Sequence, residues 1–434
     1  MGKVLMFFVD IPPFKGLGTS GGGLRAWSLY EGLKNSGFDV ILSIPSFQYL
    51  SRKFWSEIDD NLKKYAWDWG KQNEIIKEVE PEVIIFTSNW GIVDVSEKIN
   101  IPIAIDLHGP TLLEGYFSKG NMLTNEGIQT KIKKLSVGDF FIFVSERQKR
   151  YFASWLLMAG ILLRKEHYGT IPVSLSPKMP HIEFKNKLIN KKLVFVYAGG
   201  FYPWHDPTAG IEVLAETLRY YKRGELWLFT ESHKISEADV KIFKSFATKL
   251  ENNPYVKFRG LIPREELIEE YKRAHVALDL MSWNLERELA FTTRTVEYLW
   301  AGLPVIYNNY SELSEYIKRY KAGWCVDPDN PDEIRDVIEQ MLDNPEQLVE
   351  YSANAQKLVR ENFTWDKTIK PLVEFCKNPK KRDRSSDINF ENNIRVSQEV
   401  PKRGPIERAI LCYKEHGMKY TARKIIEYLK GDLR

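Results

Sequence analysis

HVALDLMSWNLERELAFTTRTVEYLWAGLPVIYNN, residues His275–Asn309, is the stretch from which the fold of this chain can be predicted. Its first residues, His275–Leu280, are mostly apolar and predict a buried strand. Polar residues dominate Ser282–Glu288 and predict a loop. Beyond the loop, apolar side chains recur at helical spacing up to Gly302, a typical stop signal, and a second strand begins at Pro304. The stretch therefore predicts strand, loop, helix and strand.

The start of the predicted helix, near Thr292 or Thr293, would face the carboxyl end of the preceding strand. Backbone N–H groups at a helix N-terminus are unpaired and carry a partial positive charge, which suits a diphosphate. We therefore assign Thr293, Arg294 and Thr295 to substrate binding; the competing interpretation of Arg294 is a surface pair with Glu297. Glu297 lies one turn into the helix, where its carboxylate could accept two hydrogen bonds from a ribose. Together these features predict a nucleotide-sugar site.

The composition fits a chain of two domains with an extension. The chain has 434 residues, of which 43% are hydrophobic, enough to fill two cores. Its net charge of +4 is mild for this length and does not argue for nucleic acid as a partner. The cysteines, Cys325, Cys376 and Cys412, form no close pair, so they predict neither a disulfide framework nor a zinc site and fit a reducing compartment.

The sequence shows neither a signal peptide nor a membrane span. The opening MGKVLMFFVD has a short apolar run without a cleavage site, and the longest apolar run, Phe152–Leu163, is too short to cross a bilayer. We therefore expect a cytoplasmic protein. The helix that contains this run has basic residues at both ends and could rest peripherally on the cytoplasmic face of a membrane. The interpretation that we favour is an amphipathic helix that covers a sheet.

Strand-like and helical segments alternate along most of the chain. Besides those of His275–Asn309, strands are predicted at Lys3–Val9, Phe38–Ile44, Val83–Thr87, Ile101–Asp106, Phe140–Val144, Leu193–Ala198, Glu225–Thr230, Tyr255–Phe258 and Trp324–Val326. Such alternation implies parallel sheets with ligands at the carboxyl ends of the strands. We predict an α/β fold with two Rossmann-like domains, residues 1–172 and 173–365.

The residues from 378 to 434 form a different kind of segment. Asn378–Gly404 is polar and mixed in charge, which predicts a flexible linker. Ile406–Leu429 has helical periodicity broken by Gly417 and predicts two short amphipathic helices. This tail could dock on the enzyme, on a partner or on a membrane surface, and the sequence leaves all three alternatives open.

The loop after the first predicted strand is rich in glycine. Gly16, Gly18 and Gly21 spell the dinucleotide-binding fingerprint, but six residues separate the strand from the first of them, and no acidic residue ends the second strand. The fingerprint therefore lacks its structural context. NAD is not expected, and we predict no cofactor.

The second half of the opening stretch resembles the donor-site signature of the family 4 retaining glycosyltransferases, which have the two-domain GT-B fold with a cleft between the domains. That signature has two glutamates separated by seven residues, then a small residue, Gly, Pro and a Val/Ile strand. Glu297 and Ala301–Ile306 match its second part. Eight positions before Glu297 stands Leu289, with Glu288 one place early and Glu286 beyond it. Either Glu288 supplies the contact to the donor sugar, which makes it our catalytic candidate, or the chain does without it.

Other segments resemble further parts of this family. Gly22, Gly23 and Arg25 resemble its N-terminal glycine loop, which approaches the donor phosphate or the acceptor; a plain strand-to-helix turn is the alternative. His108 resembles the histidine that faces the donor sugar, so it is a second catalytic candidate, with a purely structural role as its alternative. Gly200 ends the first strand of the second unit in the place of the glycine loop. The resemblance also implies a crossover helix, residues 366–377, that packs back on the first domain.

One departure from the family concerns the charge on the diphosphate. The family usually places an arginine and a lysine after the glycines of the second unit, where this chain has Phe201–Asp206. Two buried phosphate charges without a cation would be costly, so either Arg294 or Arg25 is expected to serve. The likely donor loops contain no Asp-x-Asp, so we predict no metal site.

The resemblance implies a hexosyltransferase that moves a sugar from a nucleoside diphosphate sugar to a glycan or lipid-linked acceptor, with retention and without metal. Cell-surface polysaccharide or glycoconjugate synthesis would be its setting. Two alternatives stay open. The chain could be another GT-B enzyme, such as an inverting transferase or a nucleotide-sugar epimerase. It could also be a non-catalytic protein that binds a nucleotide or a sugar.

Overall fold

The computed structural model describes residues 2–388, apart from residues 17–18, 47–57, 96–98, 119–123, 189–191 and 232–236, and beyond 388 only Met418 and Ala422. Residues up to Ile388 form one compact unit. The helices predicted within Ile406–Leu429 thus lie almost wholly outside the described residues, as does Gly18.

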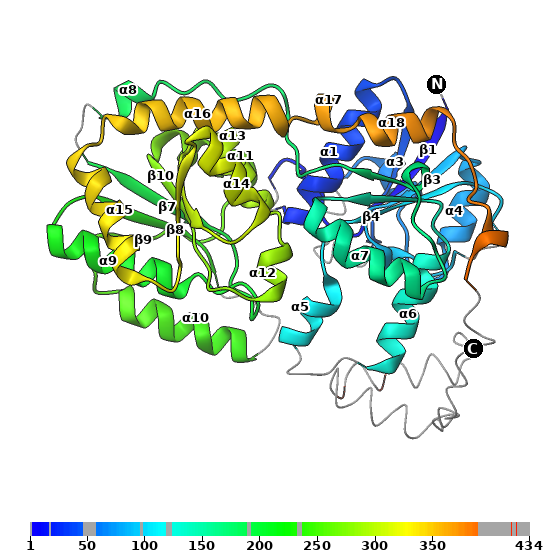
Figure 1. The fold of residues 1–434 in the computed structure, drawn as a ribbon, viewed down its shortest axis with the longest axis horizontal. Coiled ribbons are helices and arrows are strands. Elements are labelled where there is room, and N and C mark those ends of the chain that lie inside the picture. The colour runs from blue at the N-terminus through cyan, green and yellow to red at the C-terminus, as the bar shows by residue number, and fades with distance from the viewer. Residues whose placement is uncertain are drawn as a thin grey trace. The chain divides into compact units, whose positions relative to one another are not determined.

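The N-terminal domain is built on a parallel six-stranded sheet with the strand order β2-β1-β3-β4-β5-β6 (Figure 1). Its elements are β1 (Lys3–Phe7), α1 (Gly21–Asn35), β2 (Asp39–Ser43), α3 (Asp60–Lys64), α4 (Gln72–Val79), β3 (Val83–Phe86), the 3₁₀ helix η2 (Asn89–Gly91), β4 (Ile103–Leu107), α5 (Thr111–Ser118), α6 (Asn125–Ser136), β5 (Phe140–Phe143), α7 (Glu146–Met158), η3 (Lys165–His167) and β6 (Tyr168–Thr170).

The C-terminal domain repeats this plan with the order β12-β11-β10-β7-β8-β9, again all parallel. Its elements are α8 (Phe184–Lys187), β7 (Val194–Ala198), α9 (Thr208–Tyr221), β8 (Glu225–Phe229), α10 (Glu237–Leu250), β9 (Val256–Phe258), α11 (Arg264–Arg273), β10 (Val276–Asp279), α12 (Leu285–Leu289), α13 (Thr293–Trp300), β11 (Val305–Asn308), α14 (Glu312–Tyr320), β12 (Gly323–Val326), α15 (Pro331–Asp343) and α16 (Gln347–Asn362). The predicted α/β fold with two Rossmann-like sheets is confirmed.

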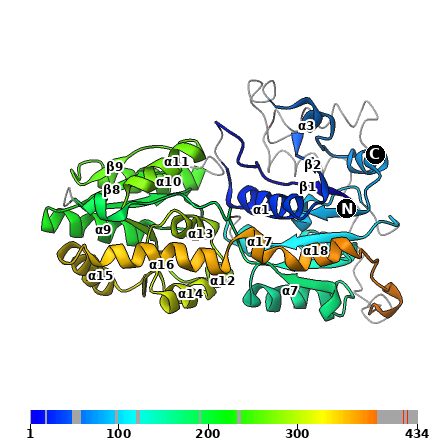
Figure 2. The same cartoon turned by 90° about the horizontal axis from the view of Figure 1, so that it is seen from above.

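Each sheet is covered by helices on both faces, so its central strands are apolar throughout. In the N-terminal domain, alternate residues of β1 point to opposite sides: Val4 and Met6 pack with α1, whereas Leu5 and Phe7 pack with α4 and α7. Figure 2 shows α1 and α7 on opposite sides of this sheet. In the C-terminal domain, α13, α14 and α16 cover one face, and α9, α10 and α15 cover the other.

The chain passes between the two domains at two places that are hydrogen-bonded to each other. The backbone N–H of Leu175 donates to Phe363 O at 2.9 Å, and the N–H of Trp365 donates to Leu175 O at 3.0 Å. After this crossing, α17 (Trp365–Thr368) and α18 (Lys370–Lys377) run back along the N-terminal domain, where Figure 1 shows them in line with α16. Leu372 of α18 lies in the hydrophobic core beside α1. This helix therefore stabilises the N-terminal domain, although it follows the C-terminal domain in the sequence.

The sequence misplaced two parts of the fold. Leu285–Leu289, predicted as loop, is the short helix α12, because Asn284 caps it by accepting a hydrogen bond from Arg287 N at 2.9 Å. The strand β6, Tyr168–Thr170, was not predicted, since three residues without strong alternation give little signal.

The start of the predicted linker differs from the expectation for Asn378–Gly404. Residues up to Ile388, which include the 3₁₀ helix η5 (Arg384–Ser386), lie against the N-terminal domain. Asp139, which is 2% exposed, holds them: its Oδ1 accepts from Arg382 N at 3.0 Å and its Oδ2 lies 3.1 Å from Lys381 Nζ. The same carboxylate accepts from Ile103 N at 2.9 Å at the start of β4.

We predict that Asp139→Ala destabilises the N-terminal domain. It leaves two buried N–H groups without their acceptor, and each costs about 1–3 kcal/mol, so the free energy of unfolding should fall by roughly 2–4 kcal/mol. Chemical unfolding followed by circular dichroism measures this. Asp343→Ala, which removes the partner of Arg223 in an exposed pair, is the control and should cost less than about 1 kcal/mol. Equal effects of the two substitutions would contradict the anchoring role.

Candidate functional site

The donor half of the candidate site lies where the strand order of the C-terminal sheet reverses. From β7 the chain proceeds outward to β8 and β9, and it then returns to β10 on the other side of β7. Ligands of open parallel sheets bind outside the carboxyl ends of the strands at such a switch point. Here the two strands end at Ala198 and Asp279, and Gly199 and Gly200 follow the first of them.

Arg294 fills the space above this switch point. A Cβ on Gly199 would lie 2.7 Å from Arg294 Nη1, so the missing side chain makes room for the guanidinium, and Gly199 also has a φ of +152°. The guanidinium lies 4.8 Å from the ring centre of Tyr197 and its Nη1 lies 3.8 Å from Asp279 Oδ1. Burial works to lower the pKa of Arg294, but Asp279 and Tyr197 outweigh it and raise that pKa. Arg294 is thus a cation at the glycine turn, and its Nη1 has no hydrogen-bond partner among the described residues.

His205 and Asp279 hold the guanidinium of Arg294 in place. Its Nη2 is hydrogen-bonded to Nε2 of His205, whose pKa burial and then Arg294 hold well below the ordinary value. A neutral imidazole accepts at Nε2, so His205 orients the guanidinium without adding charge. Thr295, assigned to substrate binding from the sequence, is fully buried, and its hydroxyl donates to Asp279 Oδ2. Its side chain therefore positions Asp279, so a contact of Thr295 with a substrate would be made by its backbone N–H.

The first N–H groups of α13 have no side-chain cap. Thr292 occupies the N-cap position, but its Oγ1 donates to Thr295 Oγ1 at 2.7 Å instead of accepting from the helix. The helix start therefore keeps the free donors that an anion needs. Thr293 Oγ1 donates to Gly21 O at 3.3 Å, which brings the start of α13 next to the start of α1. Gly200 O accepts from the Tyr197 hydroxyl at 3.2 Å, at the edge of the same space.

Glu297 pairs with Arg264 of α11. The surface pair with Arg294, which was the competing interpretation, is not formed among the described residues. Oε1 of Glu297 accepts from Arg264 Nε, on α11, at 2.7 Å, and the residue is 7% exposed. The second carboxylate oxygen accepts no hydrogen bond from the described residues. The geometry leaves one oxygen for a ligand hydroxyl, while Arg264 holds the other.

The acceptor half is organised by a chain of charges within the N-terminal domain. Arg25, which is 2% exposed, donates from Nε and Nη2 to the two oxygens of Asp106 at 2.8 and 2.7 Å. Nδ1 of His108 lies 3.3 Å from Asp106 Oδ2. Burial would raise the pKa of Asp106, but Arg25 and His108 outweigh it and lower that pKa. Arg25 is thus fully engaged inside its own domain, which is a different role from the predicted contact with phosphate.

The carboxyl groups beside His108 shift its pKa upward. Burial alone would lower the pKa of His108, but Asp106 outweighs it and raises that pKa above its ordinary value. Asp10, just after β1, contributes to the same effect, and burial raises the pKa of its own carboxyl. The imidazole therefore has a carboxylate near each nitrogen, and it is partly exposed at the end of β4.

The two glycines at the start of α1 make room for neighbouring groups. A Cβ on Gly22 would lie 2.1 Å from Asp10 Oδ2 and 3.3 Å from His108 Nε2, and one on Gly23 would lie 1.9 Å from Ile11 O. Contacts below 3.0 Å force the structure to shift, so both positions require glycine for this packing. Gly22 and Gly23 therefore let Asp10 and His108 approach α1, in addition to any contact with a substrate.

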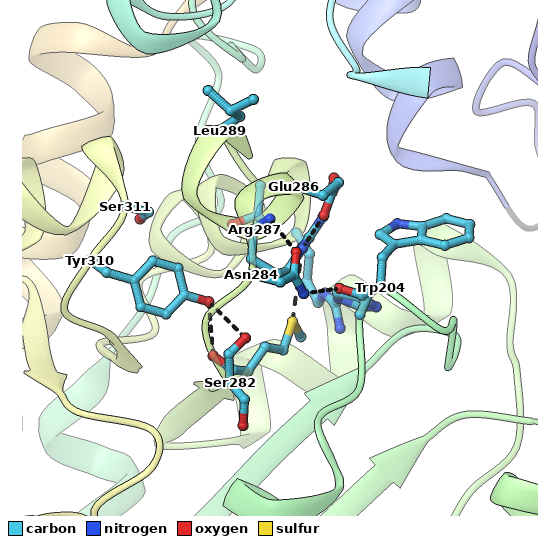
Figure 3. Close-up of polar contacts among 12 residues, drawn as sticks. Trp204, Ser282, Asn284, Glu286, Arg287, Leu289, Tyr310 and Ser311 are labelled. Atoms are coloured by element: carbon cyan, nitrogen blue, oxygen red, sulfur yellow. Dashed lines mark hydrogen bonds and ion pairs between the residues drawn. The ribbon is translucent and has the colours of Figure 1, made fainter. Parts of the chain in front are cut away.

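The two glutamates near the family signature point in different directions. In Figure 3, Glu286 lies against Arg287, which donates from Nη2 to Glu286 Oε1 at 2.7 Å. Asn284 and the Tyr310 hydroxyl hold the surrounding loop through Trp204 O, at 3.0 Å, and Met281 O, at 2.8 Å (Figure 3). Glu286 is 2% exposed, so α12 presents it as a fixed, buried carboxylate.

Glu288, our sequence-based candidate, does not join that carboxylate. Its Oε2 accepts from Trp283 Nε1 at 2.9 Å, and its Oε1 lies 3.9 Å from Arg147 Nη1. Glu286 instead lies near Glu114 of α5, whose pKa burial and then the Glu286 charge raise to about 7. His108 and Asp10 also act on the pKa of Glu114. Of the two glutamates near the family signature, Glu286 is therefore the one that shares this neighbour with the His108 site. On α12 the side chain of Glu288 points toward Trp283 and Arg147, away from Glu286, so its catalytic role stays a prediction.

Several residues of this site were not found from the sequence. Asp10, Asp106 and Asp279 stand at strand ends, a position that could have marked them. Glu114 and His205 gave no signal, since their neighbours come from distant parts of the chain. Among the described residues, no group of His, Cys, Asp or Glu is placed to hold a metal ion. In that same part of the chain, no helix has the length and apolarity needed to cross a membrane.

Comparison with known proteins agrees with this geometry. Residues 179–358 match the family model of glycosyl transferases group 1. A sucrose synthase from Denitrovibrio acetiphilus is 32% identical over 92 residues, a match that covers 20% of this chain and only 12% of that relative's length.

Solved structures show the fold of the whole unit. The sucrose-phosphate synthase of Thermosynechococcus elongatus superimposes with a TM-score of 0.64 at 16% identity, covering 87% of this chain and 98% of that one. HepE of Anabaena, in complex with UDP-glucose, gives 0.63 at 14% identity, covering 87% of this chain and all of that one (100%). The chain therefore has the GT-B fold, and its residues 179–358 match the glycosyl transferases group 1 family model.

Proposed function

We propose that this protein is a glycosyltransferase that moves a hexose from a nucleoside diphosphate sugar to a glycan or lipid-linked acceptor. The observation that carries the proposal is the convergence of Arg294 and the uncapped start of α13 on the glycine turn after β7. A buried cation and free N–H groups at one point bind a diphosphate well. The relatives support the sugar: HepE was solved with UDP-glucose, and the matched curated relative is a sucrose synthase.

The reaction would be driven mainly by electrostatics. As the bond to the sugar breaks, negative charge develops on the departing diphosphate, and preorganised donors stabilise it more than they stabilise the bound donor. Arg294 and the N–H groups of α13 supply these donors. Glu297 would hold the ribose through its second oxygen, while Glu286 and His108 would face the sugar from the two domains. Glu286 takes the place that we first gave to Glu288.

Retention of the anomeric configuration is part of the proposal because of the resemblance to family 4. One observation favours inversion as a second candidate: Asp10, beside His108, is a carboxylate with a raised pKa that could accept a proton from an acceptor hydroxyl. The anomeric configuration of the first product, read by nuclear magnetic resonance before it equilibrates, separates the two mechanisms.

The setting of the reaction is also proposed. We place the protein in the cytoplasm, with peripheral contact to the membrane face, where lipid-linked acceptors occur. Leu157 and Met158 at the end of α7, and Leu162 after it, are exposed beside the basic residues Arg164 and Lys165. The buried side of α7, with Phe152 and Leu156, covers the sheet as the favoured interpretation expected. One helix can do both.

We predict that Arg294→Ala weakens binding of UDP or GDP by tenfold or more, because a charge-assisted hydrogen bond contributes about 1.5–3 kcal/mol. Uridine or guanosine, which lack phosphate, should bind the variant and the wild type alike. Isothermal calorimetry measures both.

A matched control for this experiment is Arg319→Ala. Arg319 also lies 4.8 Å from a tyrosine ring centre, that of Tyr316, but on α14. It should leave nucleotide affinity unchanged. If instead Arg25→Ala loses diphosphate affinity while Arg294→Ala keeps it, the assignment of the cation is wrong.

We predict that Glu286→Gln lowers kcat about a hundredfold, as loss of one preorganised group at a reacting centre does, while nucleotide affinity stays close to the wild-type value. Glu288→Gln should change kcat by less than about threefold, since its contacts are exposed and weak. Steady-state kinetics with a transferable donor test this pair. A larger loss for Glu288→Gln would restore the sequence-based choice.

We predict that transfer continues in excess chelator, because Arg294 and α13 supply the positive charge that a divalent ion would otherwise bring. Rates in EDTA should stay within about twofold of those without it. Complete loss of activity, restored by manganese or magnesium, would refute the metal-free mechanism.

A further inference from the structure

The first turn of α7 contacts the C-terminal domain through three consecutive residues. The backbone N–H groups of Glu146 and Arg147 donate to the two carboxylate oxygens of Glu312, on α14, at 3.2 and 2.9 Å. A carboxylate at a helix N-terminus satisfies unpaired N–H groups and is favoured by the helix dipole. Here that carboxylate comes from the other domain, so part of the capping of α7 depends on the domains being together.

Gln148, the third of these residues, reaches further into the interface. It is 1% exposed, and its Nε2 donates to His108 O at 3.2 Å and to Leu289 O at 3.0 Å. Both neighbours are carbonyl oxygens, so the orientation of the amide is fixed: exchanging its oxygen and nitrogen would place three acceptors together. One side-chain amide group thus joins one carbonyl from each domain.

These two carbonyls belong to the two halves of the candidate site. His108 carries the imidazole that lies between Asp106 and Asp10, and its own carbonyl is the one that Gln148 holds. Leu289 is the last residue of α12, the helix that presents Glu286. The amide of Gln148 therefore sets how far the histidine lies from the glutamate.

We propose that Gln148 is a positioning residue that fixes the separation of His108 and Glu286 when the two domains close, and that the start of α7 is one of the contacts through which they close, beside that of Thr293 with Gly21. Its effect on catalysis rests on the proposed transferase function. Its effect on closure does not, because the hydrogen bonds join the domains whatever the reaction is.

The remaining contacts make this closure reversible. Gln148 Oε1 is buried without a partner among the described residues, which is a cost that only the closed form bears. Arg147 pairs with Glu315 at 3.2 Å and, at 3.9 Å, with Glu288, and these exposed pairs contribute little; its Nη1 also donates to Tyr310 O. A contact of this strength can open again to release product, as closing domains must.

The test compares Gln148→Met with Gln72→Met. Gln72 is also fully buried and donates from Nε2 to a carbonyl, Gly91 O at 2.6 Å, but inside the N-terminal domain. Both variants lose an amide and keep the side-chain length. Gln148→Met should lower kcat tenfold or more and leave the KM for the donor within about twofold, whereas Gln72→Met should lower the melting temperature and leave kcat unchanged.

A distance measurement tests closure without any activity. Spin labels on Trp69→Cys and Tyr220→Cys, exposed positions on the two domains, report the separation of the domains by pulsed electron resonance, in a chain with Cys325 and Cys412 replaced by serine. With UDP bound, Gln148→Met should give a longer and broader distribution than the wild type. Glu312→Ala, which removes the cap of α7 from the surface side, should shift it in the same direction.

The outcomes separate the two proposals. Unchanged distances in both Gln148→Met and Glu312→Ala, or an equal loss of kcat in Gln72→Met and Gln148→Met, would overturn the positioning role. If the wild type transferred no sugar from any donor, the transferase function would fail, while the distances would still decide whether Gln148 holds the domains closed.

Discussion

A buried guanidinium paired with a carboxylate near a strand end is the interaction on which both halves of this site depend. Arg294 with Asp279 occupies the switch point of the second sheet, and Arg25 with Asp106 occupies the end of β4 in the first. Burying a charge is costly unless it is paired, so each pair fixes the position of both partners. The first pair leaves its cation facing the space where a diphosphate would lie. In the second pair, the cation is fully hydrogen-bonded inside the protein. Its carboxylate, that of Asp106, also raises the pKa of His108.

The two pairs explain why arginines that look equivalent in the sequence have unequal roles. Both lie on the first turns of helices that face each other, and both were candidates for the missing cation. Arg25 makes two short hydrogen bonds to one carboxylate, whereas the nearest oxygen of Asp279 is 3.8 Å from Arg294 Nη1. The sequence shows which residues are charged and which helix carries them. It does not show whether the charge is already neutralised, because the partner comes from a strand about eighty positions away.

The fold was predictable because it depends on local signals, and the details of the site were not because they depend on distant ones. Strand positions followed from apolar runs: the strand predicted at Leu193–Ala198 is β7, Val194–Ala198. The helix α12 was missed because its signal is a single capping asparagine in a polar segment. That omission led directly to the choice of Glu288: in an extended loop a slip of one residue is easy, but on a helix it rotates a side chain by about 100°. The sequence likewise did not show that the side chain of Thr295, in the first turn of α13, points at Asp279.

Glu288, the glutamate that the sequence favoured, lies near the contact between the two domains. Glu288 lies at the edge of the contact between α7 and the C-terminal domain, next to Arg147 and on the same short helix as Glu286. Both glutamates lie on the same five-residue helix, so a movement of α12 displaces both of them. α12 therefore carries both a residue of the contact with α7 and the buried Glu286, to which we assign the reacting centre. In a two-domain enzyme this arrangement lets the reacting groups come into register only when the domains are closed, which excludes water from the reacting centre.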